Sequence, residues 1–181
     1  TSIKGLSFDV ITSVNRRSLP QLQEMKKLLI SLGVKHWRVS TIFPAGRAAE
    51  VPEFHMTGAE LKQVLDFIRE TRKEGIIQAS YGCEGFLGNY EGEVRDVPFI
   101  CNAGLSVASV LIDGSISACT SIRSNYHQGN IYTDNFWDVW QNKFQPYRDR
   151  SWMKVDQCAD CTYFRYCQGN GMHLRDDNGK L

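Results

Sequence analysis

The sequence predicts an α/β protein in two parts: the end of a parallel α/β sheet or barrel, and then a small cysteine-rich domain. Strand-like and helix-like segments alternate over roughly the first 80 residues, whereas five of the six cysteines lie beyond residue 100. With 42% hydrophobic and 23% charged residues, the 181-residue chain has an ordinary globular composition. We place the boundary between the parts between residues 81 and 98.

Charge and hydropathy exclude several classes of protein. The formal net charge of +1 argues against a nucleic-acid-binding surface, which usually shows a basic excess. No run of 18 apolar residues occurs, so no membrane-spanning helix is predicted. The start Thr1-Ser2-Ile3-Lys4 is unlike a signal peptide, and we expect a piece of a longer protein. Because nothing indicates secretion, we expect a cytoplasmic protein with reduced thiols.

The first strand and helix are predicted from residues 6–33. Residues 6–14 are β-branched and aromatic at alternating positions, which is typical of a strand. Ser18 is expected to cap a helix that has Pro20 in its first turn and ends at Gly33. The apolar stripe expected to face inward consists of Leu22, Met25, Leu28, Leu29 and Leu32.

A second strand, helix and strand follow over residues 34–80. Residues 34–42 are strand-like, and residues 76–80 form the third predicted strand. Between them, Thr57 and Glu60 make the pattern of a capping box, and the helix that they open ends at Gly75. The order β-α-β-α-β predicts parallel strands with right-handed crossovers.

The later part of the chain is rich in loops, with one predicted hairpin and one short helix. Asp113-Gly114 favours a tight turn between the strands 107–112 and 115–119. Residues 134–144 are expected to form a helix, with Phe136, Trp137 and Trp140 in the core of this domain. The tail 175–179 is expected to be a solvated turn.

The strongest chemical signal is a triplet of cysteines near the end of the chain. Cys158, Cys161 and Cys167 have the spacing Cys-x2-Cys-x5-Cys, and a tight loop can direct such thiols onto one metal centre. Cys101 and Cys119, on either side of the Asp-Gly hairpin, strengthen this interpretation. Disulfides and inert buried cysteines are the alternatives, but reduced cytosolic thiols and the bunching of these residues favour a metal or cluster site.

The spacing alone does not decide which metal is bound. The triplet supplies three of the four ligands that a tetrahedral site needs, and His173 could complete a Cys3His zinc site. An iron–sulfur cluster prefers a fourth thiolate, and none follows the triplet before Leu181. Zinc and iron–sulfur therefore both remain open from the spacing.

The ordered landmarks of this region resemble a SPASM domain, the C-terminal auxiliary-cluster extension of many radical S-adenosylmethionine (SAM) enzymes. The family pattern is a first cysteine, then Gly-x4-Cys, then Cys-x2-Cys-x5-Cys-x3-Cys and a last cysteine. Gly114 to Cys119 and the triplet match it, and the resemblance covers about residues 98–175. The landmarks are Cys101-Asn102-Ala103-Gly104, residues 113–119, Gly129-Asn130-Ile131, Trp140, Arg148, Cys158, Cys161 and Cys167.

The first 80 residues are similar to the last strands and helices of the radical SAM barrel, but three departures from the family stand out. No Cys-x3-Cys-x2-Cys loop occurs, so the cluster that cleaves SAM has no site here. Gly171 stands where the family has the cysteine after Cys167, and the chain stops before the last cysteine. Cys83 lies outside the pattern; it is a candidate substitute ligand for the Cys101/Cys119 cluster, although a plain loop cysteine is the favoured interpretation.

The resemblance implies a domain plan and a set of cofactors. It divides the chain into the end of a partial (β/α) barrel, residues 1–85, and a SPASM-like α+β domain with a β-hairpin, residues 98–181, truncated at its C-terminus. One or two auxiliary [4Fe–4S] clusters are implied, one held by Cys101 and Cys119 and the other by Cys158, Cys161 and Cys167. SAM would bind to the full-length parent.

The resemblance also implies a function. The clusters would transfer electrons or anchor substrate while the parent, a radical SAM oxidoreductase or maturase, modifies a peptide or protein. A flavodoxin or ferredoxin would supply electrons, and the present chain alone would be inactive. The alternative from another class is a zinc-stabilised structural or interaction module, with Cys158, Cys161, Cys167 and His173 around one Zn²⁺.

Overall fold

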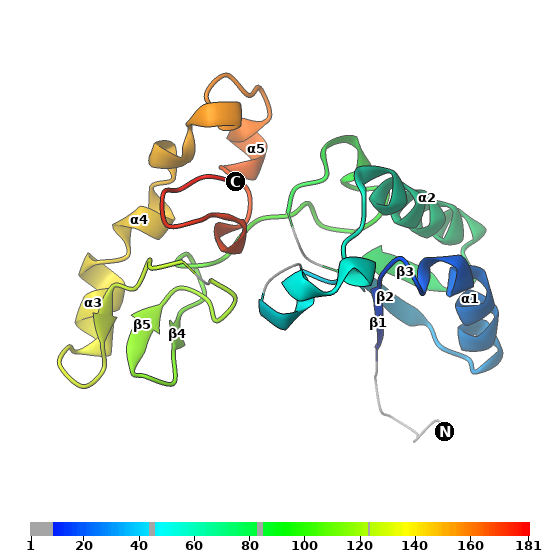
Figure 1. The fold of residues 1–181 in the computed structure, drawn as a ribbon, viewed down its shortest axis with the longest axis horizontal. Coiled ribbons are helices and arrows are strands. Elements are labelled where there is room, and N and C mark those ends of the chain that lie inside the picture. The colour runs from blue at the N-terminus through cyan, green and yellow to red at the C-terminus, as the bar shows by residue number, and fades with distance from the viewer. Residues whose placement is uncertain (1–8, 44–45, 83–84, 123) are drawn as a thin grey trace. The chain divides into compact units, whose positions relative to one another are not determined.

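A computed structural model describes residues 9–43, 46–82, 85–122 and 124–181 of the chain (Figure 1). Its contacts divide the chain into two compact units. The first unit comprises Thr1–Cys83 and Asn89–Pro98, and the second comprises Glu84–Gly88 and Phe99–Leu181. Along the chain, residues 85–88 therefore belong to the second unit, and the residues that follow them, Asn89–Pro98, belong to the first.

The first unit is a three-stranded parallel sheet with two helices. Strands β1 (Val10–Val14), β2 (His36–Thr41) and β3 (Gln78–Tyr81) lie in the order β1-β2-β3, with helices α1 (Leu22–Ser31) and α2 (Gly58–Glu74) in the crossovers. Both helices lie on the same side of the sheet (Figure 1), as two successive right-handed crossovers require. The predicted α/β alternation of this part of the chain is confirmed.

Alternation along the strands gives the sheet a covered face and an open face. Trp37 and Val39 of β2 and Ala79 of β3 are buried, and the Trp37 ring meets the Phe67 ring of α2 edge to face at a centroid distance of 5.7 Å. The indole N–H of Trp37 donates to the Thr12 hydroxyl at 2.9 Å, which satisfies its only polar group. The opposite face carries Arg38 and other polar side chains.

Helix α1 begins differently from the prediction. Ser18 does not cap it: the Ser18 hydroxyl accepts the Asn15 N–H at 3.0 Å, and a short 3₁₀ turn (Leu19–Gln21) intervenes. The Asn15 side chain accepts two further N–H groups of this loop, so the polar residues satisfy the turn and not the helix. Leu28 and Leu32 of the predicted inward stripe are 57% and 64% exposed.

Helix α2 begins and ends as predicted. The Thr57 hydroxyl accepts the Glu60 N–H at 3.2 Å, and the Glu60 carboxylate accepts the Thr57 N–H at 2.6 Å. Gly75 ends the helix in the left-handed region, with φ of +71°. Val64, Leu65 and Ile68 are buried, as their spacing predicts.

The second unit contains a small antiparallel sheet and several short helices. Strands β4 (Ser109–Val110) and β5 (Ser115–Ser117) form the predicted hairpin, in which Gly114 has φ of +83°. A third strand, β6 (Gly129–Asn130), pairs with β5 and is too short to produce a sequence pattern. The helices are α3 (Phe136–Asn142), α4 (Gln145–Arg148) and α5 (Phe164–Cys167). The further 3₁₀ turns of the chain are η2 Gly46–Glu50, η3 Pro52–Phe54, η4 Gly88–Tyr90, η5 Ser151–Met153, η6 Asp156–Cys158 and η7 Met172–Leu174.

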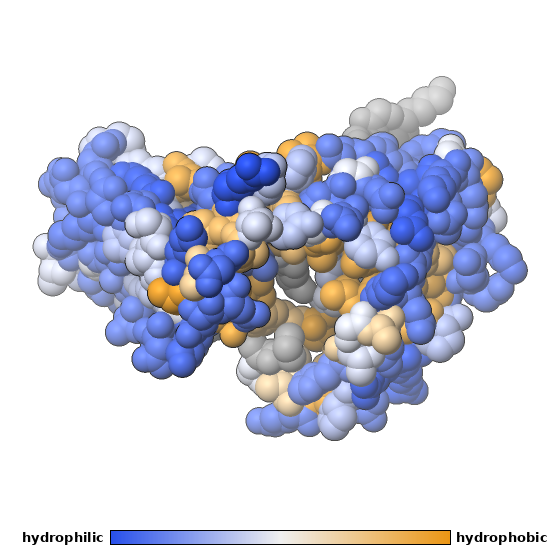
Figure 2. All heavy atoms as spheres, turned by 90° about the horizontal axis from the view of Figure 1, so that it is seen from above, coloured by the Kyte–Doolittle hydropathy of each residue, from blue (hydrophilic) through white to orange (hydrophobic). Residues whose placement is uncertain are grey.

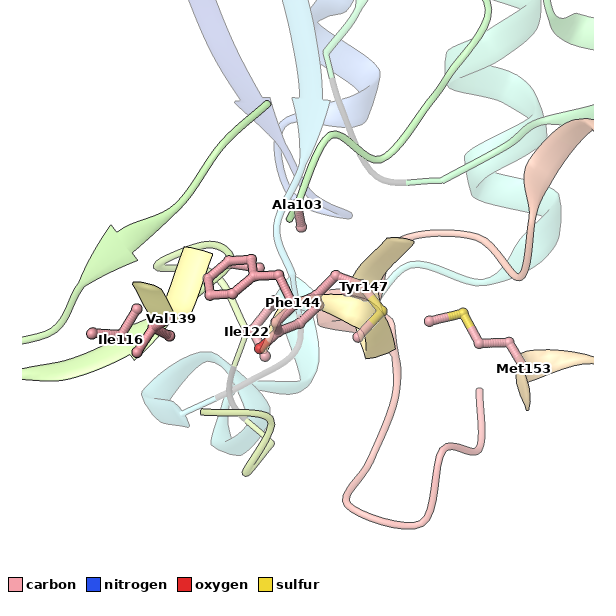
Figure 3. Close-up of a cluster of buried hydrophobic side chains, with 9 residues drawn as sticks. Ala103, Ile116, Ile122, Val139, Phe144, Tyr147 and Met153 are labelled. Carbon is pink, nitrogen blue, oxygen red and sulfur yellow. The ribbon is translucent and has the colours of Figure 1, made fainter. Parts of the chain in front are cut away.

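Phe144 and Tyr147 are central to the core of the second unit. Their rings lie 5.2 Å apart by centroid, and both side chains are fully buried (Figure 3). Ile116 of β5 lies beside Val139 of α3, so the core joins the sheet to the helices. The prediction that Trp137 belongs to this core is wrong, because that residue is 62% exposed. The full set of buried core residues is Ala103, Ile116, Ala118, Ile122, Val139, Phe144, Tyr147, Met153 and Met172.

Asp134 fastens the turn before α3 and should make the stability of the second unit depend on pH. Its carboxylate accepts the Asn130 N–H at 2.9 Å, the Lys143 ammonium at 2.9 Å and the Thr133 hydroxyl at 3.1 Å, which lowers its pKa from 3.8 to about 2. A lowered pKa contributes stability above the unfolded value that is lost as the pH falls through the folded value. We therefore expect Asp134→Asn to destabilise the protein at neutral pH and to weaken the loss of stability between about pH 4 and pH 2.

The measurement for Asp134 is urea unfolding followed by tryptophan fluorescence across this pH range. Asp138→Asn is the matched control, because it removes the same charge from the neighbouring helix without those three bonds. If the pH dependence of Asp134→Asn equals that of the wild-type chain, the Asp134 carboxylate has the same pKa in the folded and the unfolded chain.

The face of the molecule that Figure 2 shows is mainly hydrophilic. On the face shown in Figure 2, hydrophilic residues cover most of each unit, and hydrophobic residues form separate small patches. In the described part of the chain, no helix is long and apolar enough to cross a membrane.

Candidate functional site

The cysteine triplet lies on two short turns of the second unit. Cys158 ends the 3₁₀ turn Asp156–Cys158 and is 7% exposed, whereas Cys161 and Cys167 are partly buried. The Cys161 N–H donates to the Cys158 carbonyl at 3.4 Å, which is the tight turn that the Cys-x2-Cys spacing predicts. Cys167 ends α5, and Gln168 follows it in the left-handed region with φ of +47°.

Arg175 lies in the interior of the second unit, against the buried thiol. Its guanidinium donates to the Cys158 Sγ at 3.6 Å and to the Gly169 carbonyl through Nε at 3.0 Å and Nη2 at 2.8 Å. Further bonds reach the carbonyls of Met153, at 3.4 Å, and Gly179. Arg175 is 4% exposed, so the prediction of a solvated turn is wrong for this residue, whose fork of donors gathers carbonyls of three chain segments.

The other two cysteines lie at the opposite ends of the hairpin segment and pack against the core. The Cys119 Sγ accepts the Ser121 N–H at 3.5 Å. The Cys101 carbonyl accepts a bond from the Arg150 guanidinium at 2.7 Å, and Arg150 also donates to the Ala103 carbonyl at 3.0 Å. Like Arg175, Arg150 is 4% exposed.

The donor chemistry of these loops fits an iron–sulfur centre. All five cysteines that the structure describes are free thiols, and two of their sulfurs accept N–H hydrogen bonds. Thiolates are soft ligands suited to iron, and N–H bonds to sulfur stabilise their charge. A buried cationic neighbour adds to that effect.

The ligands are not gathered around a common point. Among the described residues, no group of three or more His, Cys, Asp or Glu side chains lies close enough to hold a metal ion. His173 is partly buried, burial lowers its pKa, and it does not form such a group with the triplet. Gly171 precedes the turn that contains His173, and Cys83 lies outside the described residues.

The open face of the sheet in the first unit forms a second candidate site. A cavity of about 550 Å³ has a mixed polar and apolar lining, made of Ile11, Arg38, Ser40, Ser80, Tyr81, Gly82, Arg95, Asp96 and Val97. Arg38 is paired with Asp9 at 2.9 Å, and the Arg95 guanidinium lies 5.4 Å from the centre of the Tyr81 ring. The sequence indicated no role for Arg95, because its place beside the sheet depends on the return of residues 89–98.

Besides Arg95, the site residues that the sequence did not indicate are the two buried arginines of the second unit. Arg175 and Arg150 contact cysteine residues of the two predicted ligand groups, but each is far in sequence from the cysteine that it touches. No spacing rule connects them. No signal in the sequence could have found them, because a charged residue is expected at the surface unless the folded structure shows otherwise.

Comparison with known proteins finds a family model that is similar to part of the second unit. Residues 101–162 match the family model described as SPASM, an iron-sulfur cluster-binding domain. That range contains Cys101, Cys119, Cys158 and Cys161 and ends before Cys167.

Three curated relatives are named AdoMet-dependent heme synthase. Those of Oleidesulfovibrio alaskensis and Nitratidesulfovibrio vulgaris are each 22% identical, over 96% and 91% of this chain and 50% and 49% of their own lengths. That of Methanosarcina barkeri is 25% identical, over 90% of this chain and 50% of its own length. The chain thus spans about half the length of the curated relatives that it matches.

A solved structure shares the fold. The structure of native anSMEcpe with bound AdoMet and Cp18Cys peptide matches 95% of this chain and 50% of its own chain, with a TM-score of 0.58 and 17% identity. Together, these comparisons confirm the resemblance to radical SAM enzymes with a SPASM domain, and the α/β fold class with it. They support iron–sulfur clusters as cofactors, and none of them names zinc.

Proposed function

We propose that this chain, which carries a SPASM-type iron–sulfur cluster-binding domain over residues 101–162, supplies the auxiliary clusters of a radical SAM enzyme. The observation that carries the proposal is the agreement of this match with the placement of the free thiols. Cys119 and Cys158 have sulfurs that already accept N–H bonds, as cluster ligands do.

The ligands divide between two clusters. Cys101 and Cys119 serve one cluster, and Cys158, Cys161 and Cys167 serve the other. In the second group, Cys158 is buried and Cys161 and Cys167 are partly buried, and these three thiolates would hold the iron of that cluster. The free energy of cluster binding would then contribute to the stability of the folded turns.

Bound at these cysteines, the clusters would supply electron transfer or an anchoring site for substrate during radical modification of a peptide or protein. This assignment rests on the family resemblance and on the shared fold with a protein whose solved structure holds a peptide. A small electron carrier, a flavodoxin or a ferredoxin, supplies the electrons. The protein contributes orientation, hydrogen bonds to sulfur and seclusion from water, and the cofactors supply the radical chemistry.

A tetrapyrrole is the second candidate substrate. Three relatives that match 90% or more of this chain are named AdoMet-dependent heme synthase, which makes a carboxylate-bearing macrocycle an alternative to a peptide. Arg38 and Arg95 line the cavity of the first unit and could pair with such carboxylates. Each already has a carboxylate partner, Asp9 at 2.9 Å for Arg38 and Glu91 at 3.5 Å for Arg95, so the ligand would have to compete with these ion pairs.

Metal and sulfide analysis of anaerobically reconstituted protein tests the cluster assignment. We expect iron and acid-labile sulfide above about four each per chain, with broad thiolate-to-iron absorption that bleaches with dithionite. Zinc alone, at about one per chain, would replace this proposal with the zinc module of Cys158, Cys161, Cys167 and His173.

Ligand titration distinguishes the two candidate substrates. Heme and a cysteine-containing peptide are each titrated into the reconstituted protein while tryptophan fluorescence is followed. Saturable quenching by heme that weakens in Arg38→Gln favours the tetrapyrrole, whereas a saturable response to the peptide alone favours peptide modification. Arg17→Gln, at an exposed loop position, is the control for loss of charge.

A further inference from the structure

We propose that Arg175 is the buried counter-charge of the cluster held by Cys158, Cys161 and Cys167, and that it raises the reduction potential of that cluster. This inference rests on the proposed function, because it assigns a role to a residue beside one of the proposed ligands. Its basis is the environment of a single guanidinium group.

Arg175 places a positive charge in the interior of the second unit. The residue is 4% exposed, and its guanidinium is always protonated in proteins. Placing such a charge out of water is expensive unless an anion compensates it. The energetic question is therefore which anion pairs with it.

No carboxylate of the described residues forms an ion pair with the Arg175 guanidinium. Within the described part of the chain, every ion pair shorter than 4.0 Å involves other residues. The Arg175 guanidinium donates to the neutral carbonyls of Gly169, Gly179 and Met153 and to the sulfur of Cys158. Of these four, only the sulfur acquires a negative charge when it binds metal.

Hydrogen bonds to backbone carbonyls fix the orientation of the Arg175 guanidinium. Four carbonyl bonds hold the guanidinium in one orientation, so that Nη2 points at the Cys158 Sγ 3.6 Å away. The tail is itself fixed, because the Arg175 carbonyl accepts the Ser124 hydroxyl at 2.5 Å and the Asn125 N–H donates to Asp177 at 2.6 Å. The charge therefore cannot swing away from the sulfur.

The consequence is a change in reduction potential. One-electron reduction adds a negative charge to a cluster, and a fixed positive charge at a ligand sulfur stabilises the reduced form more than the oxidised one. Arg175 therefore acts through Cys158, as a positioning and tuning residue. Removing its charge makes the cluster harder to reduce.

The test compares Arg175→Met with the wild-type chain, both reconstituted anaerobically. We expect at least a tenfold lower ratio of reduced to oxidised cluster at a fixed potential, which corresponds to a midpoint about 59 mV more negative for one electron. Arg148→Met is the matched control, since Arg148 also donates to three carbonyls but contacts no sulfur among the described residues. A cluster held by Cys101 and Cys119 serves as an internal reference.

Arg175→Lys keeps the proposal falsifiable if Arg175→Met loses the cluster. Lysine retains the charge without the fork, so a midpoint close to wild type, or cluster retention where Arg175→Met has none, supports the proposal. An unchanged midpoint in Arg175→Met overturns it, as does an equal shift or equal cluster loss in both variants. Absence of iron and sulfide from the wild-type chain instead refutes the proposed function, which separates the two failures.

Discussion

Replacing Cys158 with serine is expected to remove about half of the iron and sulfide from the reconstituted protein, because one of two four-iron clusters loses a ligand. Cys158 is the most buried cysteine of the described chain and receives the Arg175 bond, so its sulfur is the fixed point onto which the other ligands close. Serine preserves the size and polarity of the side chain but is a poor ligand for iron.

The measurement is iron and acid-labile sulfide per chain, accompanied by the visible spectrum. Thr162→Ala is the control, because Thr162 is exposed in the same turn and follows the predicted ligand Cys161. Cys119→Ser should remove the other half of the iron. Full iron retention in Cys158→Ser would contradict the ligand assignment, and loss of all iron would indicate one cluster in place of two.

Replacing Phe144 with alanine is expected to lower the free energy of unfolding of the second unit by about 3–5 kcal/mol. The Phe144 ring is fully buried and lies 5.0 Å from the Trp140 ring and 5.2 Å from the Tyr147 ring by centroid. The ring packs within a cluster of buried side chains, so its removal leaves a cavity that the close-packed core fills only in part. Cys101 and Cys119 pack against the same core, and we also expect weaker iron retention.

Denaturant unfolding of the metal-free chain measures this effect without the contribution of the clusters. Trp137→Ala is the matched control, since it removes a larger aromatic side chain from the adjacent helix at a position 62% exposed. We expect that variant to change the free energy of unfolding by less than about 0.5 kcal/mol. Equal effects of the two substitutions would contradict the core assignment.

Arg150 and Arg175, the two buried arginines of the second unit, suggest how a small unit rich in loops keeps its cysteine-bearing turns in place. Arg150 and Arg175 each collect carbonyl oxygens from separate segments, in place of the ladders that long strands would provide. Strands β4 and β6 contain two residues each, so regular pairing satisfies little of the backbone. The guanidinium groups of these arginines, each with five N–H donors, bond to backbone carbonyl oxygens that strand pairing leaves unpaired.

Local signals in the sequence were sufficient for much of the fold. The Thr57/Glu60 capping box, the left-handed Gly75 and the Asp113-Gly114 turn were all predicted, because each depends on residues within a few positions of one another. Hydrophobic periodicity likewise gave the parallel β-α-β-α-β order of the first unit. Local chemistry misled at Ser18, whose hydroxyl bonds to Asn15 and not to the helix.

For the candidate site, the sequence by itself determined the thiols, their spacing and the family that they resemble, since a ligand set is a matter of residue type and local turns. The tertiary structure decided what surrounds them: that Cys158 is the buried member, that Trp137 faces solvent and that Arg175 comes to lie beside a sulfur 17 residues away in sequence. These features depend on how segments distant in the chain pack together. No local propensity or spacing encodes such packing, because burial and a buried charge are properties of the assembled interior.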